Sequence, residues 1–303
     1  MIDKLEMFIA LAREKHFGRA AEDCRVTQPT LSSAIKQLED QFGVMLVRRG
    51  SRYQGLTPEG QRVLEWARRI VADVRSMQED LRTARYGLSG HLRIAAIPTA
   101  LSAVAELTAP FAEAHPGITF TVLSRNSVEI LSLLENLEID VGITYLDNEP
   151  LGRVTTVPLY EERYAFVTQA DGPHAGKSSI TWKEVAAAPL CLLTPDMQNR
   201  RIVNQKMGEA GASANPTLES NSVITLFAHV RTGRWSSVMP WRLVDAFGRL
   251  DNLTAIPIVE PEAVESIGLV AAYREPHTPV LAALLAEARK VSQLLPREKQ
   301  PSA

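Results

Sequence analysis

The strongest constraint on this chain is a long helix-forming run from Pro58 to Leu88, in which no helix breaker stands between the first turn, with Gly60, and Gly87. Apolar residues recur along the run at alternating steps of four and three: Val63, Ala67, Ile70, Val74, Met77, Leu81, Ala84 and Leu88. Such a heptad stripe is typical of coiled coils. A single helix of about 30 residues cannot cover its own stripe, so we expect a second copy of the chain to cover the first six of these positions in a dimer. The alternative is that the stripe packs on the chain's own domains.

The run separates two parts of different charge. Residues 1–90 contain 15 Lys and Arg against 12 Asp and Glu, whereas the remaining residues contain 18 against 23. This basic surplus is too small to identify a nucleic-acid binder by itself. With 303 residues, of which 45% are hydrophobic and 22% charged, the chain has the composition of a globular protein of two or three domains.

The sequence predicts neither a membrane-spanning nor a secretory segment. No apolar run approaches the roughly 20 residues that a membrane-spanning helix needs. The N-terminal segment carries acids rather than the basic start of a signal peptide. The two cysteines, Cys24 and Cys191, suit a reducing compartment. We therefore expect a cytoplasmic protein without a membrane partner.

Three short helices are predicted ahead of the long run, the first two within residues 3–24. The third begins at Gln28, with Thr27 as its N-cap and Pro29 in its first turn, and ends at Gly43. Its expected buried face consists of Leu31, Ile35, Leu38 and Phe42. The segment VMLVRRGSRYQGLTP that follows indicates two strand-like pieces around a Gly/Ser turn, as in a hairpin.

The outward face of the third helix is polar. Burial of the apolar stripe leaves six side chains facing outward: Gln28, Thr30, Ser32, Ser33, Lys36 and Gln37. Hydroxyl and amide groups hydrogen-bond phosphate oxygens and base edges, and a helix N-terminus favours anions. The arrangement therefore suits a helix that enters a DNA groove. A small helical domain with a polar face that binds protein is the alternative.

The same stretch resembles a known family. The paired alanines of FGRAAEDC, followed by TQPTLS, AIKQLE, FGVMLVRR and LTPEG, closely resemble the winged helix-turn-helix of LysR-type transcriptional regulators. Matches of pattern extend along the chain in LRIAAIPT, AHPGITF, LLENLEIDVGI and VMP. The resemblance implies an α/β protein with an N-terminal winged helix-turn-helix, a long linker helix and a C-terminal two-lobed effector domain like a periplasmic binding protein. The implied boundaries are residues 1–58, 59–90 and 91–303.

The resemblance also implies a DNA-binding surface. In a helix-turn-helix the second helix lies in the major groove, and its N-terminal residues touch base edges and phosphates. The residues assigned to DNA contacts are Thr27, Gln28, Pro29, Thr30, Ser32, Ser33, Lys36, Gln37, Arg48, Arg49 and Arg52. The three arginines would straddle the backbone or enter the minor groove. Many family members carry a basic residue where this chain has Ser33, which leaves the base contact at that point open.

Strands alternate with helices beyond the linker, which implies a parallel sheet with helices on its faces. Two extended segments, at 154–168 and 265–275, would be the crossings between two α/β lobes. By the resemblance, lobe I comprises residues 91–161 with 267–303, and lobe II comprises residues 162–266.

An effector site is expected where the two lobes face each other, because helix N-termini at the ends of parallel strands point their amides toward such a crevice. Thr99 and Ser127, each at the start of a helix, suit a small carboxylate, and Asn126 opens a capping-box pattern. The positions that match the family's effector site are Thr99, Ala100, Asn126, Ser127, Tyr145, Pro195, Met197, Gln198, Asn199 and Arg200, the last as counter-charge. The alternatives are that the two hydroxyls only cap helices and that Arg200 faces solvent.

The resemblance further implies how such a regulator works. Family members pair through the linker helix, assemble into homotetramers that bend double-stranded promoter DNA, and change that bend when a small effector binds. RNA polymerase is a further candidate partner. The chain also looks like members encoded beside formate dehydrogenase genes, which suggests formate or another small organic anion as effector. The expected location is the bacterial cytoplasm, at the nucleoid.

Other chemistry is not favoured by the sequence. Redox-sensing relatives use a cysteine pair in the sensor, whereas this sensor has only Cys191, in an apolar strand where an inert thiol is expected. The Gly-Lys-Ser at 176–178 lacks the earlier glycine of a phosphate-binding loop, since Asp171 stands there. The six histidines show no metal-ligand spacing, so no metal is expected, and neither is a cofactor or an enzyme activity. An enzyme with an added DNA-binding domain is the alternative from another class.

Overall fold

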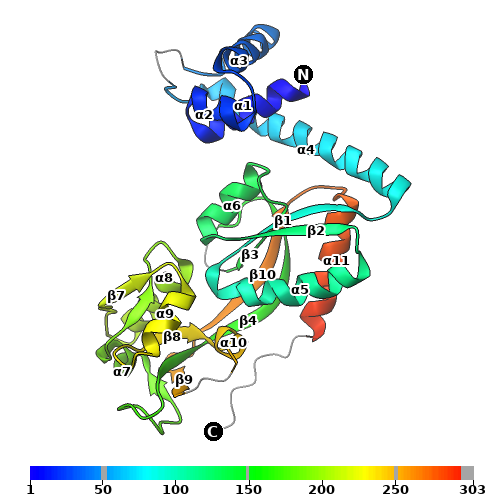
Figure 1. Cartoon of the computed structure of the whole chain (residues 1–303). Helices are drawn as coiled ribbons and strands as arrows, with labels where there is room; N and C mark the ends of the chain where they lie inside the picture. The colour runs from blue at the N-terminus through cyan, green and yellow to red at the C-terminus, as the bar shows by residue number, and fades with distance from the viewer. Residues whose placement is uncertain (49–52, 148–149, 249–251, 295–303) are drawn as a thin grey trace. The chain divides into compact units, whose positions relative to one another are not determined.

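The computed structural model describes residues 1–48, 53–147, 150–248 and 252–294 of the chain. Its contacts divide the chain into two compact units (Figure 1). The N-terminal unit comprises Met1–Leu88 with the short segments Glu135–Glu138 and Pro276–Pro279, and the remainder forms the C-terminal unit.

Four helices make up most of the N-terminal unit: α1 (Ile2–Glu14), α2 (Phe17–Asp23), α3 (Gln28–Phe42) and α4 (Pro58–Tyr86). His16, Thr27 and Thr57 cap α2, α3 and α4, since each side chain accepts a hydrogen bond from a backbone N–H of the first turn. Gly43 ends α3 in the left-handed conformation, with φ of 69°. The predicted start and end of α3 are therefore confirmed.

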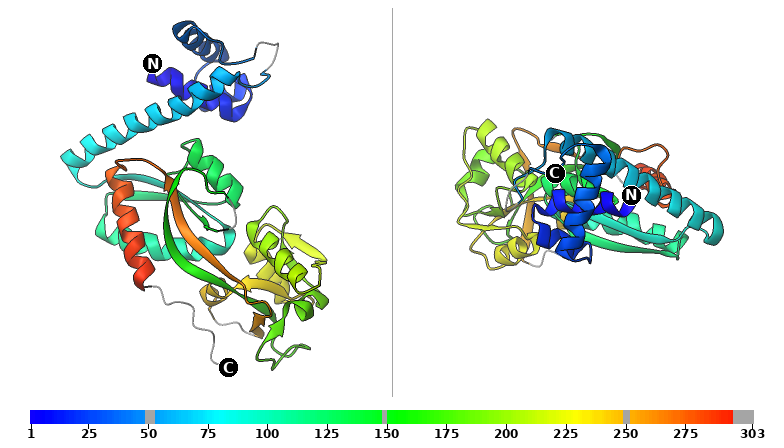
Figure 2. Two further views of the ribbon diagram at one scale, coloured as in Figure 1. Left: turned by 180° about the vertical axis from the view of Figure 1, so that it is seen from behind. Right: turned by 90° about the horizontal axis from the view of Figure 1, so that it is seen from above.

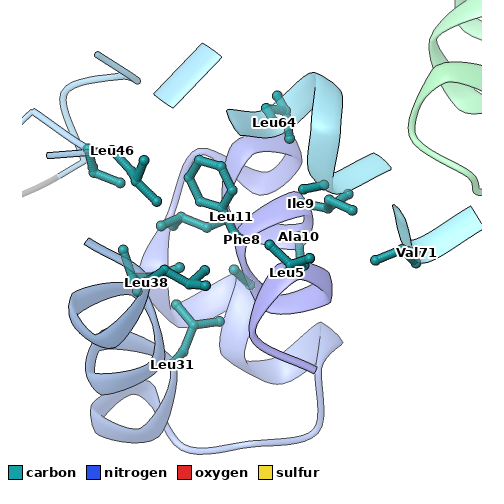
Figure 3. Close-up of a cluster of buried hydrophobic side chains, with 14 of the residues drawn as sticks. Leu5, Phe8, Ile9, Ala10, Leu11, Leu31, Leu38, Leu46, Leu64 and Val71 are labelled. Atoms are coloured by element: carbon teal, nitrogen blue, oxygen red, sulfur yellow. The ribbon is translucent and has the colours of Figure 1, made fainter. Parts of the chain in front are cut away.

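The core of the N-terminal unit contains apolar side chains from all four helices and from the segment after α3 (Figure 3). Its fully buried members include Leu5, Phe8, Ile9, Leu11, Ala20, Ala21, Leu31, Ile35, Leu38, Leu46, Leu64, Ala67 and Val71. The prediction that Phe42 is buried with Leu31, Ile35 and Leu38 is wrong, because Phe42 is 40% exposed. The core ends before the helix does, so the last three residues of α3, Asp40 to Phe42, are exposed, as is Val44.

Of the predicted hairpin after α3, the described residues show one antiparallel bridge, between Val47 and Leu56. Its central residues 49–52 lie outside the described residues. The carboxylate of Glu39 fixes this segment to α3, because its Oε1 accepts from the backbone N–H of Leu46 (2.8 Å) and of Val47 (3.1 Å). A side chain of α3 thus sets the position of the wing's first strand.

The strands of the C-terminal unit belong to a mixed sheet and a small separate one. They are β1 (Gly90–Ala96), β2 (Ile118–Ser124), β3 (Val141–Tyr145), β4 (Val154–Gln169), β5 (Ile180–Thr181), β6 (Cys191–Leu193), β7 (Leu218–Ser220), β8 (Ser237–Pro240), β9 (Leu253–Val259) and β10 (Val264–Ala272). The main order is β2-β1-β3-β10-β4-β9-β5, with β8 paired to β4, and β6 pairs β7 separately. Strands β1 to β3 are parallel as predicted, whereas β10 and β4 run antiparallel to their neighbours.

The strand β10 pairs along its whole length with the first part of β4, from Val264 opposite Arg163 to Ala272 opposite Val154. They run side by side through the unit, with lobe I at one end and lobe II at the other (Figures 1 and 2). The predicted crossing segments are therefore confirmed. They also explain why the sheet is mixed, since a chain that crosses to lobe II and returns must reverse direction.

The remaining helices cover the two lobes. They are η1 (Pro98–Ala100, a 3-10 turn), α5 (Leu101–Ala114), α6 (Ser127–Glu135), α7 (Trp182–Ala187), α8 (Gln198–Glu209), α9 (Val223–Val230), α10 (Trp241–Ala246) and α11 (Pro279–Leu294). Helices α5, α6 and α11 lie with β1 to β3, and α7 to α10 lie with the strands of lobe II (Figure 1). No helix in the described part of the chain is long and apolar enough to cross a membrane.

Candidate functional site

The outward face of α3 is the first candidate site. Every residue predicted to contact DNA there is exposed: Thr27, Gln28, Pro29, Thr30, Ser32, Ser33, Lys36 and Gln37. The hydroxyl oxygens of Thr27 and Thr30 lie 2.8 Å apart, and Nε2 of Gln37 donates to Oγ of Ser33 at 3.3 Å. These contacts are open to solvent, so phosphates and base edges can replace them at little cost.

The wing supplies one described cation. Arg48 is exposed, and its backbone N–H donates to the carbonyl of Gly55 at 3.0 Å. The other two predicted wing residues, Arg49 and Arg52, lie outside the described residues. Their assignment to DNA therefore stays a prediction from the sequence.

The junction between the wing and α4 depends on Gly60. A Cβ at this position would lie 2.1 Å from the carbonyl oxygen of Leu46, so two backbone segments approach more closely here than any side chain allows. Thr57 ties the same segments together, because its N–H donates to the carbonyl of Leu46 (3.0 Å) and its hydroxyl to that of Met45 (2.5 Å). The LTPEG motif thus fixes the first turn of α4 beside the wing.

The apolar stripe of α4 divides into two parts. Ala67 is fully buried in the core of the N-terminal unit, and Val63 packs against the same core. By contrast, Ile70, Met77 and Leu81 are 37%, 57% and 65% exposed. The start of the stripe therefore packs on its own unit, which corrects the prediction that a second copy covers Ala67. The later positions remain accessible on this unit.

Trp66 is an exposed residue of α4 that the heptad pattern missed. It is 60% exposed and lies four residues before Ile70, which is as good a helical step as the three from Ala67. The guanidinium of Arg69 lies 4.9 Å from its ring centroid. Spacing alone could not predict which of positions 66 and 67 is exposed, because the exposed position depends on which side of α4 faces α1.

The lobe I half of the predicted effector site contains two buried hydroxyls. Thr99 and Ser127 are each 2% exposed. Neither is a helix cap: α5 begins after Ala100, whose side chain has no polar atom. Helix α6 is capped by Asn126, whose Oδ1 accepts from the N–H of Glu129 (2.9 Å) while the Glu129 carboxylate accepts from the N–H of Asn126 (3.2 Å). The predicted capping box is confirmed, and the alternative that the two hydroxyls only cap helices is wrong.

The hydroxyl of Thr99 makes no hydrogen bond among the described residues, although its oxygen is buried. A buried polar group without a partner costs about 1–3 kcal/mol. Native structures leave few such groups, and each one needs an explanation. A ligand is one such explanation here.

Lobe II supplies the N-terminus of α8. Gln198 and Asn199 are 7% and 5% exposed, and Nδ2 of Asn199 lies 3.5 Å from the hydroxyl oxygen of Tyr145 at the end of β3. Met197 packs in the core of lobe II, and Pro195 is exposed. The structure therefore brings Asn199 and Tyr145 together but gives Met197 an internal packing role.

Arg200 does not reach this region as predicted. Its side chain is buried in lobe II, where Nη1 donates to the carbonyl of Leu193 (2.8 Å) and to the Glu219 carboxylate (2.5 Å), and Nε donates to Asn204 (2.8 Å). Both the proposed counter-charge and the alternative of a solvated face are therefore wrong. Arg200 joins α8 to β6 and β7.

Arg201, the next residue, is the cation that the sequence interpretation missed. Its Nη2 lies 3.4 Å from Oγ of Ser127 in lobe I, its Nη1 donates to the carbonyl of Asp196 (2.9 Å), and its Nε donates to Gln198 (2.8 Å). The sequence does contain a pattern that separates the two arginines. Position 200 shares a helical face with two apolar residues, at 203 and 207, so its side chain is expected to point inward. Position 201 lies off that face.

One further contact links the lobes at this point. Nδ2 of Asn126 lies 3.5 Å from the Asp196 carboxylate. The pKa of Asp196 is lowered, first by a hydrogen bond with Thr194 and also by Asn126 and the charge of Arg201. Arg201 and Asp196 thus form a charged pair of opposite sign beside Ser127.

The cysteine of the C-terminal unit is inert. Cys191 is fully buried in β6, its Sγ lies 3.7 Å from the carbonyl oxygen of Leu226, and burial raises the pKa of its thiol to about 11. Peroxide reacts with a thiolate rather than a thiol. Cys191 therefore lacks the accessibility and the ionisation of a redox sensor.

Two family models match nearly all of the chain. The model of the LysR substrate binding domain matches residues 85–293, and that of the bacterial regulatory helix-turn-helix protein, lysR family, matches residues 2–61. The chain belongs to the LysR family. It is a DNA-binding transcriptional regulator with an effector-binding domain, as the members of this LysR family are regulators rather than enzymes.

Among curated LysR relatives, the DNA-binding transcriptional dual regulator OxyR of Escherichia coli is 31% identical over 273 residues, which cover 89% of this chain and 88% of the relative. Among solved structures, a full-length OxyR variant from Pseudomonas aeruginosa, with one cysteine replaced by aspartate, matches with a TM-score of 0.73 and 25% identity, over 95% of this chain and 97% of that one. Full-length CbnR complexed with its target DNA matches with a TM-score of 0.57 and 22% identity, over 96% and 99%, which shows the fold alone.

Proposed function

We propose that this LysR-family regulator binds promoter DNA through the exposed face of α3 and the wing, and that a small organic anion held between the two lobes modulates that binding. The buried Thr99 hydroxyl, which has no partner among the described residues, is the observation that carries the effector half of the proposal. The contact between Ser127 and Arg201 supports it, since it joins lobe I to lobe II at a second buried hydroxyl of the predicted effector site.

The chemistry of the site favours an anion. Arg201 offers a guanidinium, Thr99 and Ser127 offer hydroxyls, and the N-termini of α5, α6 and α8 offer backbone N–H groups. Because the two hydroxyls are only 2% exposed, the lobes must part to admit a ligand, and a short one disturbs their packing least. We therefore infer a short carboxylate, formate included.

A redox signal is the second candidate, because the similar OxyR proteins are described as hydrogen peroxide-inducible gene activators. The state of Cys191 argues against it here. A buried thiol whose pKa is raised to about 11 by desolvation is neither exposed nor ionised at neutral pH. We infer that the effector acts by binding rather than by oxidising the sensor.

The proposed assembly rests on the exposed half of the α4 stripe. A dimer that buries Ile70, Met77 and Leu81 presents two copies of α3 to two half-sites, about 34 Å or a multiple apart. Two such dimers would form a homotetramer that bends DNA, and the effector would shift an existing equilibrium between bent forms. RNA polymerase is the proposed partner downstream of that shift.

A thermal-shift screen with sodium formate, acetate, oxalate and succinate tests the effector class. A bound anion at about 100 times its Kd stabilises the folded protein by about 2.7 kcal/mol, and the variant Ser127→Leu should lose this shift while it keeps binding to promoter DNA. Ser178→Leu, at an exposed position of lobe II, is the matched control and should keep both. The proposal fails if none of the four anions shifts the wild-type protein, or if Ser127→Leu abolishes DNA binding.

A further inference from the structure

A buried carboxyl group lies where the two lobes cross. Glu162 is in β4, one of the two crossing strands, and is 0% exposed. Its Oε1 accepts a hydrogen bond from the hydroxyl of Tyr145 at 2.6 Å. A buried carboxyl is costly unless it is hydrogen-bonded, and the 2.6 Å contact with Tyr145 is a short hydrogen bond.

The hydroxyl of Tyr145 joins three elements. Tyr145 ends β3 in lobe I, Glu162 belongs to the crossing strand, and Asn199 in the first turn of α8 approaches the same oxygen from lobe II at 3.5 Å. Burial, and then the charge of Glu162, raise the pKa of Tyr145 well above its usual value. The hydroxyl therefore stays protonated and donates to Glu162, while its oxygen faces Asn199 and the hydroxyl of Tyr164.

A second carboxyl makes this bond more important. Glu265 in β10 lies directly opposite Glu162 in the antiparallel register, so the two side chains are neighbours on one face of the crossing strands. Two adjacent carboxyl groups repel each other when both are ionised. The donor Tyr145 binds Glu162 from β3, the strand on the other side of β10.

We propose that Glu162 is a positioning residue, which through the Tyr145 hydroxyl and Asn199 holds the N-terminus of α8 against lobe I and so sets how far the lobes close. The inference rests on the proposed function, because α8 also carries Arg201 of the effector site. It assigns Glu162 no contact with the effector.

The distance between the lobes tests this directly. Spin labels on Glu113→Cys in α5 and Ile224→Cys in α9, both exposed positions, report lobe closure by double electron–electron resonance. The background carries Cys24→Ser and Cys191→Ala, and the labelled chain is diluted with an excess of unlabelled chain to remove distances between copies. The variants are Glu162→Gln, which keeps an acceptor oxygen, together with Glu162→Leu, Tyr145→Phe and the last two combined.

We expect one dominant distance in the reference protein and in Glu162→Gln. Glu162→Leu and Tyr145→Phe should each add a longer-distance population, and the double variant should add no more than either single one. A loss of thermal stability without any change of distance would assign Glu162 a purely structural role and overturn the proposal. Tyr145→Phe removes one oxygen atom, so the test holds even if Glu162→Leu does not fold. Because neither effector nor DNA is used, this result is independent of the carboxylate screen.

Discussion

At the scale of single residues, neighbours in the sequence have opposite roles. Arg200 is buried and neutralised inside lobe II, whereas Arg201 reaches Ser127 in lobe I. The sequence showed that a cation follows Gln198 and Asn199 but not which arginine would reach the site, since one residue along a helix rotates a side chain by about 100°. Thr99 and Ser127 were predictable, because helix starts after strands point toward the crevice between lobes.

Substitutions of the two arginines should have different effects on stability and on effector binding. Arg200→Gln should lower the stability of the protein by about 2 kcal/mol, less than the ~3–5 kcal/mol of a fully buried pair, because the Glu219 side chain is 40% exposed. Arg201→Gln should cost about 1 kcal/mol, the net contribution of a typical hydrogen bond, but remove the thermal shift produced by a bound carboxylate. Denaturant unfolding with and without sodium formate or acetate measures both. Equal stability losses in the two variants would contradict these roles.

Gly60 offers a second test at this scale. Gly60→Ala places a Cβ against the backbone oxygen of Leu46 and should destabilise the N-terminal unit by about 1–3 kcal/mol. Gly208→Ala is the matched control, because Gly208 also lies in a helix but an added Cβ there would meet no atom within 4 Å. It should be neutral or stabilise by up to about 1 kcal/mol. Calorimetry of the full chain measures both, and an unchanged transition in Gly60→Ala would show that the close approach is not required.

The thiol of Cys191 offers a third test at the scale of single residues. Because burial raises the pKa of Cys191 to about 11, the thiol stays protonated at pH 7, and ionisation grows only as the pH approaches that value. We expect hydrogen peroxide to leave DNA binding of the native protein unchanged and Cys191→Ala to behave like wild type. Mass spectrometry of the oxidised cysteines checks this. Peroxide-dependent binding that Cys191→Ala abolishes would restore the redox signal as the effector.

At the scale of elements, the sequence pattern predicted the features that depend only on nearby residues. The bounds of α3 followed from Thr27 and Gly43, and the crossing strands from their length. Features that depend on a neighbouring element were missed: the exposure of Phe42 depends on where the core ends, and the choice of Trp66 over Ala67 depends on the side of α4 that meets α1. The parallel sheet became mixed for the same reason, because the return strand pairs with elements that its own sequence does not specify.

The exposed half of α4 should control pairing of two chains. Leu81→Glu introduces a charge at a position that is 65% exposed in the single chain, so it should shift the protein from dimer or tetramer to monomer without lowering its thermal stability. Arg82→Glu changes the charge at the adjacent exposed position and should leave assembly intact. Sedimentation velocity measures both. An unchanged assembly in Leu81→Glu would exclude this stripe as the interface.

At the scale of the whole molecule, one unit carries a polar helix face and the other carries two lobes joined by β4 and β10. The family assignment of the two parts rests on two models, which match residues 2–61 and residues 85–293. Neither unit explains regulation by itself. The proposal requires that two copies of the N-terminal unit bind one duplex and that the lobes change how they do so.

The most direct test is the binding of the full-length protein to a fluorescent duplex from its own upstream region, measured by sedimentation velocity over a series of salt concentrations. We expect an even number of chains on each duplex, an affinity that falls steeply with salt, and a salt slope reduced by about one in Lys36→Gln but not in the lobe II control Lys183→Gln. A protein that sediments as a monomer and leaves the duplex unbound at low salt would contradict the account.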